Sequence, residues 1–121
     1  MARITGLGGV FFKCDDPKAL SAWYRDVLGF AIEEWGGALL KSQAGGAPHA
    51  VWAPFASDTD YFAPSSHPFM INFAVDDLDG MIRQIEAKGV AILGRQEMKG
   101  LGQFAWLIDP AGVKVELWQP A

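Results

Sequence analysis

The sequence predicts an α+β fold in which one supersecondary unit, a strand followed by a helix and another strand, occurs twice. The first sign is an apolar strand that ends in a pair of aspartates, at residues 15–16 and again 61 residues later at 76–77. The second is a glycine after each predicted helix, Gly29 and Gly89, at an offset of 60 residues. Residue type, order and element type agree together, so we interpret the chain as a duplication.

A first helix is predicted to begin at Pro17. Asp16 can accept hydrogen bonds from the first turn, proline fits the first helical position, and Gly29 can end the helix in the left-handed conformation. Apolar residues recur between these ends at helical spacing, which makes one apolar stripe. The stripe consists of Leu20, Trp23, Tyr24, Val27 and Leu28.

A second helix is predicted after Asp76 or Asp77, with Gly89 at its end. Its apolar stripe consists of Leu78, Met81, Ile82 and Ile85. New strands are expected directly after both helix-ending glycines, near residues 30–32 and 90–92.

Alternation along the strands predicts which face each side chain occupies. One set should pack on the helices, namely Val10, Phe12, Cys14, Ile71, Phe73, Val75, Val113, Val115 and Leu117. The other set mixes polar and aromatic residues, as in the lining of a solvent-accessible cleft. It consists of Gly9, Phe11, Lys13, Met70, Asn72, Ala74, Lys114, Glu116 and Trp118.

Glycine and proline mark the turns. Residues 109–112, Asp-Pro-Ala-Gly, predict a hairpin between two strands, and turns are also expected at 36–37 and 45–46. The segment 53–68 is rich in Asp, Ser and Pro, yet it contains three aromatic residues. A pure linker does not usually carry such residues, so we expect this loop to pack, and one place for it is over the cleft.

Length and charge restrict the class of protein. At 121 residues the chain is expected to form one domain, residues 1–121, made of two modules at about 1–64 and 65–121. The net charge of −4, without clustered Lys and Arg, argues against a nucleic-acid partner. Neither a membrane-spanning run nor a signal peptide is recognised, so the expected compartment is the cytoplasm without a membrane partner. One cysteine, Cys14, cannot form an internal disulfide.

Several separated motifs resemble the vicinal oxygen chelate superfamily, which includes glyoxalase I, fosfomycin-resistance enzymes, extradiol dioxygenases and bleomycin-resistance proteins. The motifs are Asp-Asp-Pro at 15–17, Trp-Tyr-Arg-Asp-Val-Leu-Gly-Phe at 23–30 and the closing hairpin at 109–118. The resemblance spans nearly the whole chain. It implies two βαβββ modules that form a cupped mixed sheet, closed within the chain or across a homodimer.

In metal-dependent relatives the first and last strands of each module supply ligands to a divalent ion, which polarises vicinal substrate oxygens. Matched by motif, these positions hold Gly9, Met70 and Glu116, with Ala50 or Trp52 at the fourth. Glycine has no donor and a thioether is a poor ligand for such metals. The resemblance therefore implies no cofactor and no conventional metal centre, while an unconventional divalent site stays open.

Glu116 is the first candidate for chemistry. A lone glutamate in a concave site can accept a hydrogen bond from a ligand, act as a general base, or pair with Lys13 or Lys114. His67 is a second catalytic candidate if it reaches the cleft near Glu116, and otherwise a solvated loop residue. Aromatic and amide side chains are predicted to contact a ligand, although tryptophan is also ordinary core material. These are Phe11, Trp52, Tyr61, Asn72, Gln103, Trp106 and Trp118.

The leading functional prediction is a glyoxalase/bleomycin-resistance-like, homodimeric protein that binds a small organic molecule in its cleft without a conventional metal. The first alternative is a lyase, isomerase or dioxygenase that uses Glu116 with His67. A further alternative is a resistance protein that sequesters a cationic or planar aromatic drug.

Overall fold

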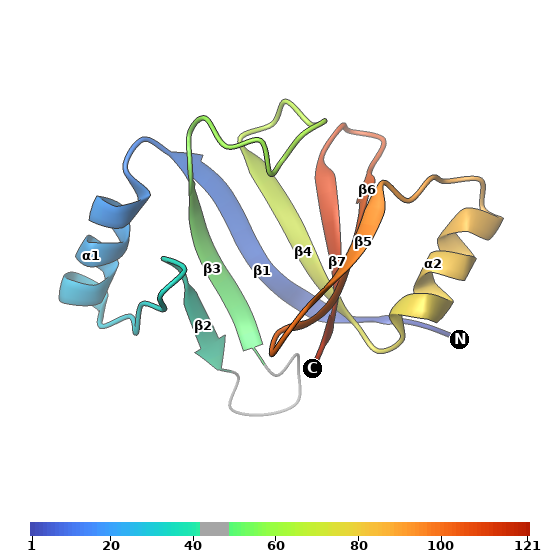
Figure 1. Ribbon diagram of the computed structural model, residues 1–121, viewed down its shortest axis with the longest axis horizontal. Coiled ribbons are helices and arrows are strands. Elements are labelled where there is room, and N and C mark those ends of the chain that lie inside the picture. The colour runs from blue at the N-terminus through green and yellow to red at the C-terminus, as the bar shows by residue number, and fades with distance from the viewer. Residues whose placement is uncertain (42–48) are drawn as a thin grey trace.

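The computed structural model describes residues 1–41 and 49–121. Over this part of the chain, seven strands form one mixed sheet in the order β2-β3-β1-β4-β7-β6-β5, with two helices near its ends (Figure 1). The turn expected at 45–46 lies outside the described residues. In chain order the elements are β1 (Ile4–Cys14), α1 (Pro17–Leu28), β2 (Ala38–Lys41), β3 (His49–Ala56), β4 (Phe69–Val75), α2 (Leu78–Ala87), β5 (Gly94–Met98), β6 (Gly102–Ile108) and β7 (Lys114–Pro120).

The duplication is visible in the strand pairing. β1 lies parallel to β3 in the first module, and β4 lies parallel to β7 in the second. The two modules join through the antiparallel pair of β1 and β4, the central strands of the sheet. The sheet is therefore continuous within one chain.

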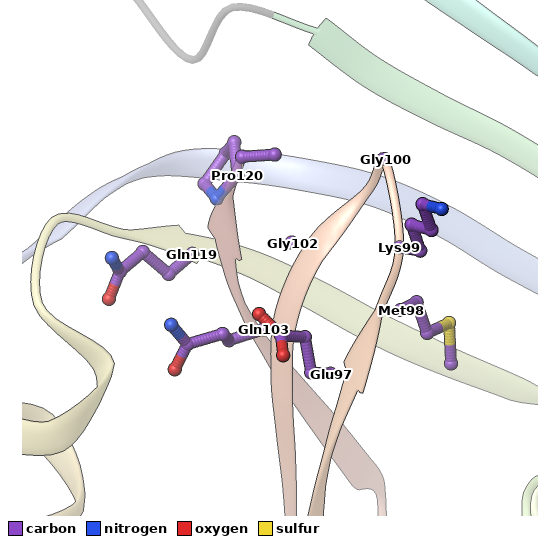
Figure 2. Close-up of a pocket in the computed structure, with 9 residues that line it drawn as sticks. Glu97, Met98, Lys99, Gly100, Gly102, Gln103, Gln119 and Pro120 are labelled. Atoms are coloured by element: carbon purple, nitrogen blue, oxygen red, sulfur yellow. The ribbon is translucent and has the colours of Figure 1, made fainter.

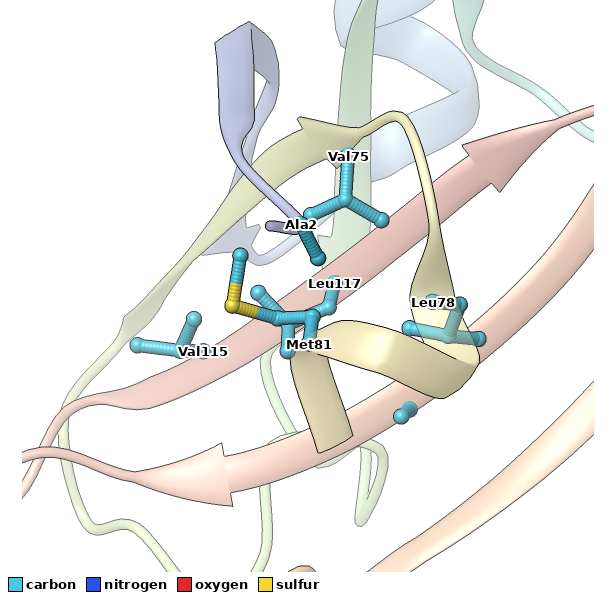
Figure 3. Packing of buried hydrophobic residues seen from close by; sticks show 7 residues of the cluster. Ala2, Val75, Leu78, Met81, Val115 and Leu117 are labelled. Carbon is cyan, nitrogen blue, oxygen red and sulfur yellow. The ribbon is translucent and has the colours of Figure 1, made fainter. Parts of the chain in front are cut away.

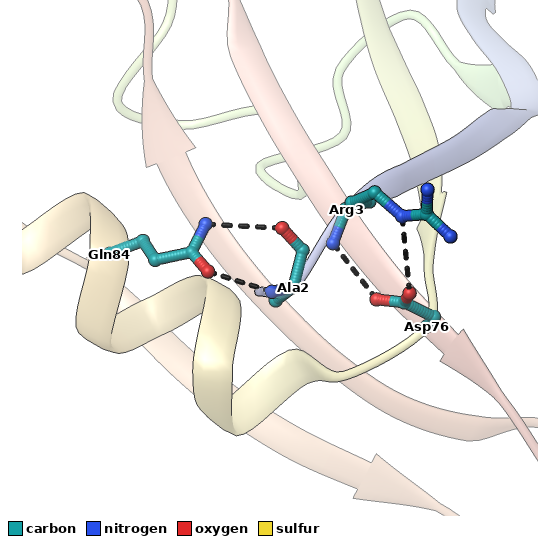
Figure 4. Close-up of polar contacts among 4 residues, drawn as sticks. All are labelled: Ala2, Arg3, Asp76 and Gln84. Carbon is teal, nitrogen blue, oxygen red and sulfur yellow. Dashed lines mark hydrogen bonds and ion pairs between the residues drawn. The ribbon is translucent and has the colours of Figure 1, made fainter.

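The N-terminal residues extend this connection by binding to the second module. Ala2 exchanges two hydrogen bonds with the carboxamide of Gln84 on α2, at 2.8 and 3.1 Å (Figure 4). The backbone N–H of Arg3 donates to Asp76 at 2.9 Å. The start of the first module is thus anchored to the helix of the second.

The helix ends follow the sequence signals. Asp16 accepts a hydrogen bond from the N–H of Ala19, Pro17 occupies the first turn of α1, and Gly29 has φ of 76°. Asp77 caps α2 through the N–H of Gly80. Both predicted helices are confirmed.

The strands expected directly after the helices are not present. The N–H of Phe30 donates to the carbonyl of Tyr24, and that of Val90 donates to the carbonyl of Ile85. These bonds satisfy carbonyls at the helix ends, so the residues after Gly29 and Gly89 complete helices instead of starting strands. The second module is a full βαβββ unit, whereas the described part of the first has one strand fewer.

Both helices cover the same side of the sheet, which we call the back face. Val75, Val115 and Leu117 pack there against Leu78 and Met81 of α2 (Figure 3). At the other end, the Trp52 ring lies 4.3 Å from that of Tyr24 on α1. This agrees with the predicted faces of β4 and β7. No helix within the described ranges is long and apolar enough to cross a membrane.

The opposite, concave face carries a second apolar cluster. Phe11, Ala53 and Met70 from three strands pack against Phe62, which is 1% exposed. Phe62 belongs to the connection between β3 and β4, which joins the upper ends of these strands in Figure 1. The expectation that this aromatic loop packs is confirmed, and its place is the concave face.

Candidate functional site

The concave face contains a cleft of about 130 Å³. Two polar residues, Asn72 and Glu116, line it together with aromatic and aliphatic side chains from both modules. The apolar lining is Phe11, Trp35, Leu39, Val51, Ala53, Phe55, Tyr61, Met98, Leu101, Phe104 and Trp118. This combination, mostly apolar with a few converging polar groups, is typical of small-molecule sites.

Glu116 lies within this cleft and accepts hydrogen bonds from three side chains. Asn72 Nδ2 donates to Oε1 at 2.6 Å, while the Tyr61 hydroxyl and Trp106 Nε1 donate to Oε2 at 2.6 and 2.7 Å. Strand register places two of these donors, because Asn72 on β4 and Trp106 on β6 are the direct neighbours of Glu116 on β7. Tyr61 comes from the aromatic loop. Both carboxylate oxygens are therefore engaged by the protein.

Burial dominates the electrostatics of this cluster. Glu116 is 1% exposed, and burial raises its pKa above the ordinary value, against the three hydrogen bonds and the charge of Lys114. Burial, the charge of Glu116 and their hydrogen bond also raise the pKa of Tyr61, so the phenol keeps its proton and donates. A raised carboxyl pKa in a cleft is a feature of functional sites, although structural networks produce it as well.

Lys114 on β7 binds the aromatic loop through a hydrogen bond and a cation–π contact. Its Nζ donates to the backbone carbonyl of Tyr61 and lies 5.1 Å from the centroid of the Tyr61 ring. It also lies 5.5 Å from the centroid of the Trp106 ring, a cation–π distance. Burial lowers the pKa of Lys114, whereas the negative charges of Glu116 and Asp60 oppose this change. The lysine thus holds in place two of the groups that donate to Glu116.

The two polar atoms of the Asn72 side chain differ in their hydrogen bonding, because Nδ2 donates to Glu116 and Oδ1 does not take part in that contact. Its Oδ1 is a buried side-chain oxygen without a hydrogen-bond partner in the described structure. This oxygen lies beside Gly8, where an added Cβ would stand 1.8 Å from it. Glycine at position 8 therefore makes room for the carboxamide that binds Glu116. Gly8 was not among the predicted site residues, although a glycine inside a strand often marks such a close approach.

The residues present do not fit a conventional divalent metal. Gly9 and Met70 occupy the first-strand positions, and a Cβ at Gly9 would stand 2.4 Å from the carbonyl oxygen of Val51. On β3 the cleft is lined by Val51 and Ala53. The fourth position was predicted at Ala50 or Trp52, but neither of these residues lines the cleft.

The chemistry of the donors points the same way. The oxygens of Glu116 already accept from three protein groups, and its neighbours are apolar or hydrogen-bond donors. Among the described residues, no three His, Cys, Asp or Glu side chains gather as metal ligands would. A divalent ion needs several oxygen, nitrogen or thiolate ligands, which the described residues of this cleft do not supply.

Three predicted site residues lie elsewhere. Trp52 faces the back of the sheet, where its ring packs on Tyr24, so it does not line the cleft. His67, in the connection between β3 and β4, contacts the turn between β6 and β7, with Nε2 3.0 Å from the carbonyl oxygen of Ala111. The structure does not bring it to Glu116.

Gln103 also differs from its predicted place. It lies on β6 between Glu97 of β5 and Gln119 of β7, in an open groove of about 580 Å³ near the C-terminal end (Figure 2). Its Oε1 accepts from Arg95 at 3.1 Å. Gln103 does not line the cleft that contains Glu116, although Met98 borders both cavities.

Six of the predicted residues come together at the cleft. Phe11, Tyr61, Asn72, Glu116 and Trp118 line it, and Trp106 reaches it through its hydrogen bond to Glu116. Sequence reasoning missed several lining residues. Alternation on β3 could have identified Val51 and Phe55, since they share a face with Ala53. Trp35, Met98 and Leu101 lie at or just beyond strand ends, where alternation along a strand does not predict which face a side chain occupies.

The sequence matches the model of the Glyoxalase/Bleomycin resistance protein/Dioxygenase superfamily over residues 6–117. No curated protein matches it significantly.

Solved structures show the same fold. Methylmalonyl-CoA epimerase from Mycobacterium tuberculosis is 24% identical, with a TM-score of 0.67 over 98% of this chain and 89% of that one. A variant of the Streptomyces coelicolor methylmalonyl-CoA epimerase, in complex with 2-nitronate-propionyl-CoA, is 25% identical, with a TM-score of 0.69 over 98% and 99% of the two chains. The 2,2',3-trihydroxybiphenyl 1,2-dioxygenase from Sphingomonas wittichii is 19% identical, with a TM-score of 0.59 over 98% of this chain and 42% of that one.

Proposed function

Because the chain belongs to the glyoxalase/bleomycin resistance/dioxygenase superfamily, we propose that its concave cleft binds a small, largely apolar organic molecule without a conventional divalent metal. The observation that carries this proposal is the cleft itself. Aromatic and aliphatic side chains from both modules surround a carboxylate whose oxygens already accept from Asn72, Tyr61 and Trp106. A bound molecule would then gain mainly from apolar burial.

The size of the cleft limits the part of the ligand that it encloses. Its volume of about 130 Å³ is similar to that of an engineered cavity of about 150 Å³ that holds benzene. We therefore propose that one ring, or an aliphatic group of similar size, enters the cleft. The rings of Phe11, Phe55 and Trp118 would contact it.

The relatives support a small-molecule site on this fold. Methylmalonyl-CoA epimerase has been solved with methylmalonyl-CoA and with 2-nitronate-propionyl-CoA. For this chain we base the proposed ligand class on the residues that line its own cleft. These residues are mostly apolar, which favours an apolar ligand over a charged acyl group. We also propose a cytoplasmic protein without nucleic-acid or membrane partners, consistent with its net charge of −4 and single cysteine.

A substitution that fills the cleft tests the proposal. Single-ring aromatic compounds such as phenol and toluene should raise the melting temperature of the wild-type protein, with a shift that grows logarithmically once their concentration exceeds their dissociation constants. In Val51→Phe the added ring should occupy the cleft and abolish this stabilisation. Val27→Phe, on the exposed side of α1, is the matched control and should respond like wild type.

Two results would contradict the proposal. Stabilisation that persists in Val51→Phe would place the ligand elsewhere, and absence of any stabilisation in the wild type would remove the binding function. Elemental analysis that finds one tightly held divalent metal per chain would overturn the metal-free part.

A second candidate is an enzyme in which Glu116 acts as a general base, and the raised carboxyl pKa in the cleft favours it. The carboxylate would take a proton from a bound substrate, as in a lyase or isomerase reaction. Turnover of a substrate found by screening should be lost in Glu116→Gln and kept in Glu97→Gln, which alters an exposed glutamate on β5. Unchanged turnover in Glu116→Gln would remove Glu116 from the mechanism.

Drug sequestration has less support. Glu116 is the acidic residue among those that line the cleft, and its oxygens are engaged by the protein. A cationic drug would therefore lack a free carboxylate to pair with, although a neutral planar compound would meet the same aromatic walls.

A further inference from the structure

The side-chain oxygen of Asn72 is a hydrogen-bond acceptor to which no described group of the protein donates. Asn72 lines the cleft and is 1% exposed, and its Oδ1 has no partner in the described structure. Buried polar atoms in proteins are almost always hydrogen-bonded, so an exception at the lining of a cleft calls for an explanation. A donor that arrives with the ligand provides one.

The contact with Glu116 determines which way the carboxamide points. While Glu116 is ionised, its Oε1 can only accept, so the Asn72 atom that lies 2.6 Å away must be the donor Nδ2. A half turn of the carboxamide would set two oxygen atoms against each other. Oδ1 therefore points away from Glu116, towards Gly8 on β1.

The other side-chain donors at the cleft are engaged elsewhere. The Tyr61 hydroxyl and Trp106 Nε1 both donate to Glu116 Oε2, and Trp118 Nε1 donates to the carbonyl of Leu101. The remaining described residues of the lining have apolar side chains. Within the part of the chain that the structure describes, the lining thus offers no further side-chain donor for the carboxamide oxygen.

The acceptor lies next to a wall of the cleft that is proposed to contact the ligand. Oδ1 lies 1.8 Å from the position of a Cβ at Gly8, and Trp118 Cε3 lies 3.1 Å from the same position. A ring that packs on Trp118 would therefore bring a substituent at its edge close to Oδ1. Because water hardly reaches this oxygen, the ligand must shift a neighbouring side chain slightly, as is common on binding.

The surroundings restrict the chemistry of the donor. An anionic ligand would be repelled by the carboxylate of Glu116. A cationic ligand would find no free carboxylate, because both oxygens of Glu116 already accept from the protein. A neutral O–H or N–H group meets neither difficulty, and its burial is compensated by the hydrogen bond to Oδ1.

We infer that the cleft prefers single-ring ligands that carry one neutral donor, of the phenol class, and that Asn72 Oδ1 accepts the hydrogen bond from this donor. The inference rests on the proposed function, because it requires a ring in the cleft. It adds a choice between rings of similar size. Phenol and toluene are such a pair, since a hydroxyl in one replaces a methyl group in the other.

Titration calorimetry of the wild-type protein with phenol and toluene tests this preference. In a cleft without an acceptor, toluene should bind more tightly, because burial of an unpaired hydroxyl is unfavourable. With Oδ1 as the acceptor, phenol should bind at least as tightly as toluene. Weaker binding of phenol would overturn the inference and leave the proposed function intact, whereas absence of binding by both compounds would overturn both.

Selective labelling reports directly on the acceptor. Asn72 is the single asparagine of the chain, so asparagine labelled with 13C at Cγ gives one side-chain signal in the spectrum of the full protein. Phenol should move this signal further downfield than toluene, because a carbonyl carbon is deshielded when its oxygen accepts a hydrogen bond. The ring currents of the two compounds are similar, so equal shifts would overturn the inference.

Asn72→Leu removes the acceptor. In this variant the affinity for phenol relative to toluene should fall about tenfold, because the hydroxyl loses its partner. Gln103→Leu is the matched control, since it removes a carboxamide that does not line the cleft, and it should keep the wild-type ratio. An unchanged ratio in folded Asn72→Leu would overturn the inference. If circular dichroism shows that Asn72→Leu does not fold, the wild-type titration and the Asn72 signal decide.

Discussion

At the centre of the cleft, the carboxyl group of Glu116 is almost completely removed from water and surrounded by three donors. Removal from water favours the protonated form, whereas the donors favour the charged form. Burial is the larger effect, so the pKa of Glu116 is raised in the folded protein. The cost of keeping this group charged in the folded state makes stability depend on pH.

We predict that the free energy of unfolding falls as pH rises above about 4.5, the ordinary pKa of this carboxyl group. Below that value the group is protonated in both states. Between the ordinary and the raised pKa, the folded state binds more protons than the unfolded state, so increasing pH favours unfolding. Urea unfolding at a series of pH values should show this fall, and Glu116→Gln should remove it.

The matched control for this experiment is Glu97→Gln. Glu97 is exposed on β5, so the pH profile of this variant should follow that of the wild type. A profile that is identical in wild type and Glu116→Gln would contradict the prediction.

A second prediction for individual residues concerns the hydrogen bond between Tyr61 and Glu116. Tyr61→Phe should lower the free energy of unfolding by about 1–3 kcal/mol near neutral pH, because a buried carboxylate oxygen loses a donor. Combined with Glu116→Gln, the two effects should not add, since both act on one contact. Tyr24→Phe on the back face serves as the control, and additive effects in the double variant would show that the contact is unimportant.

At the scale of the strand, Gly8 allows β1 and β4 to carry the polar network. We predict that Gly8→Ala lowers the free energy of unfolding by about 1–3 kcal/mol, because its Cβ would stand 1.8 Å from Asn72 Oδ1. Gly94→Ala is the matched control, with the nearest atom 4.0 Å from its Cβ. Chemical denaturation of both variants measures the difference, and equal stabilities would contradict the close approach.

The elements that the sequence predicted best are those with local signals. The start of α1 follows from Asp16 and Pro17, and its end from Gly29, because each residue acts on its own turn. The prediction of a strand after Gly29 was wrong for a related reason. Phe30 uses its N–H to close the helix end, a bond that alternation of apolar residues does not reveal.

For the candidate site too, residues with a local sequence signal were placed correctly, and a residue whose position depends on distant contacts was not. Glu116 and Asn72 were placed correctly on the cleft side, because alternation along β4 and β7 holds without interruption. Trp52 was misplaced because the face that a residue of β3 occupies depends on how this strand pairs with β1. Val10 lies opposite Trp52 on the back face, and this contact between distant segments cannot be read from a local motif.

Across the whole molecule, the shared sheet and the aromatic loop join the modules into one body. Phe62, which the loop buries against Phe11 and Met70, contacts strands from both halves. We therefore expect a single cooperative unfolding transition, with coincident curves from far-ultraviolet circular dichroism and tryptophan fluorescence. Separate transitions would show that the modules unfold independently.

Removal of the Phe62 ring should destabilise the whole transition. Phe62→Ala is expected to lower the free energy of unfolding by about 3–5 kcal/mol, because it leaves a cavity between the modules. Leu93→Ala, at an exposed site, should change it by less than about 0.5 kcal/mol. Denaturant titration of both variants makes the comparison, and similar losses would mean that the loop contributes little.

The anchoring of Ala2 to Gln84 also orders events during synthesis. The methyl group of Ala2 belongs to the core beneath α2. Because α2 lies far along the chain, Ala2 leaves the ribosome long before its neighbours in the folded protein have been made. The first module can pair its own strands early, but its leading residues find their partners only when α2 has been made. Ala2 and Arg3 thus reach their final positions only after the second module has been made.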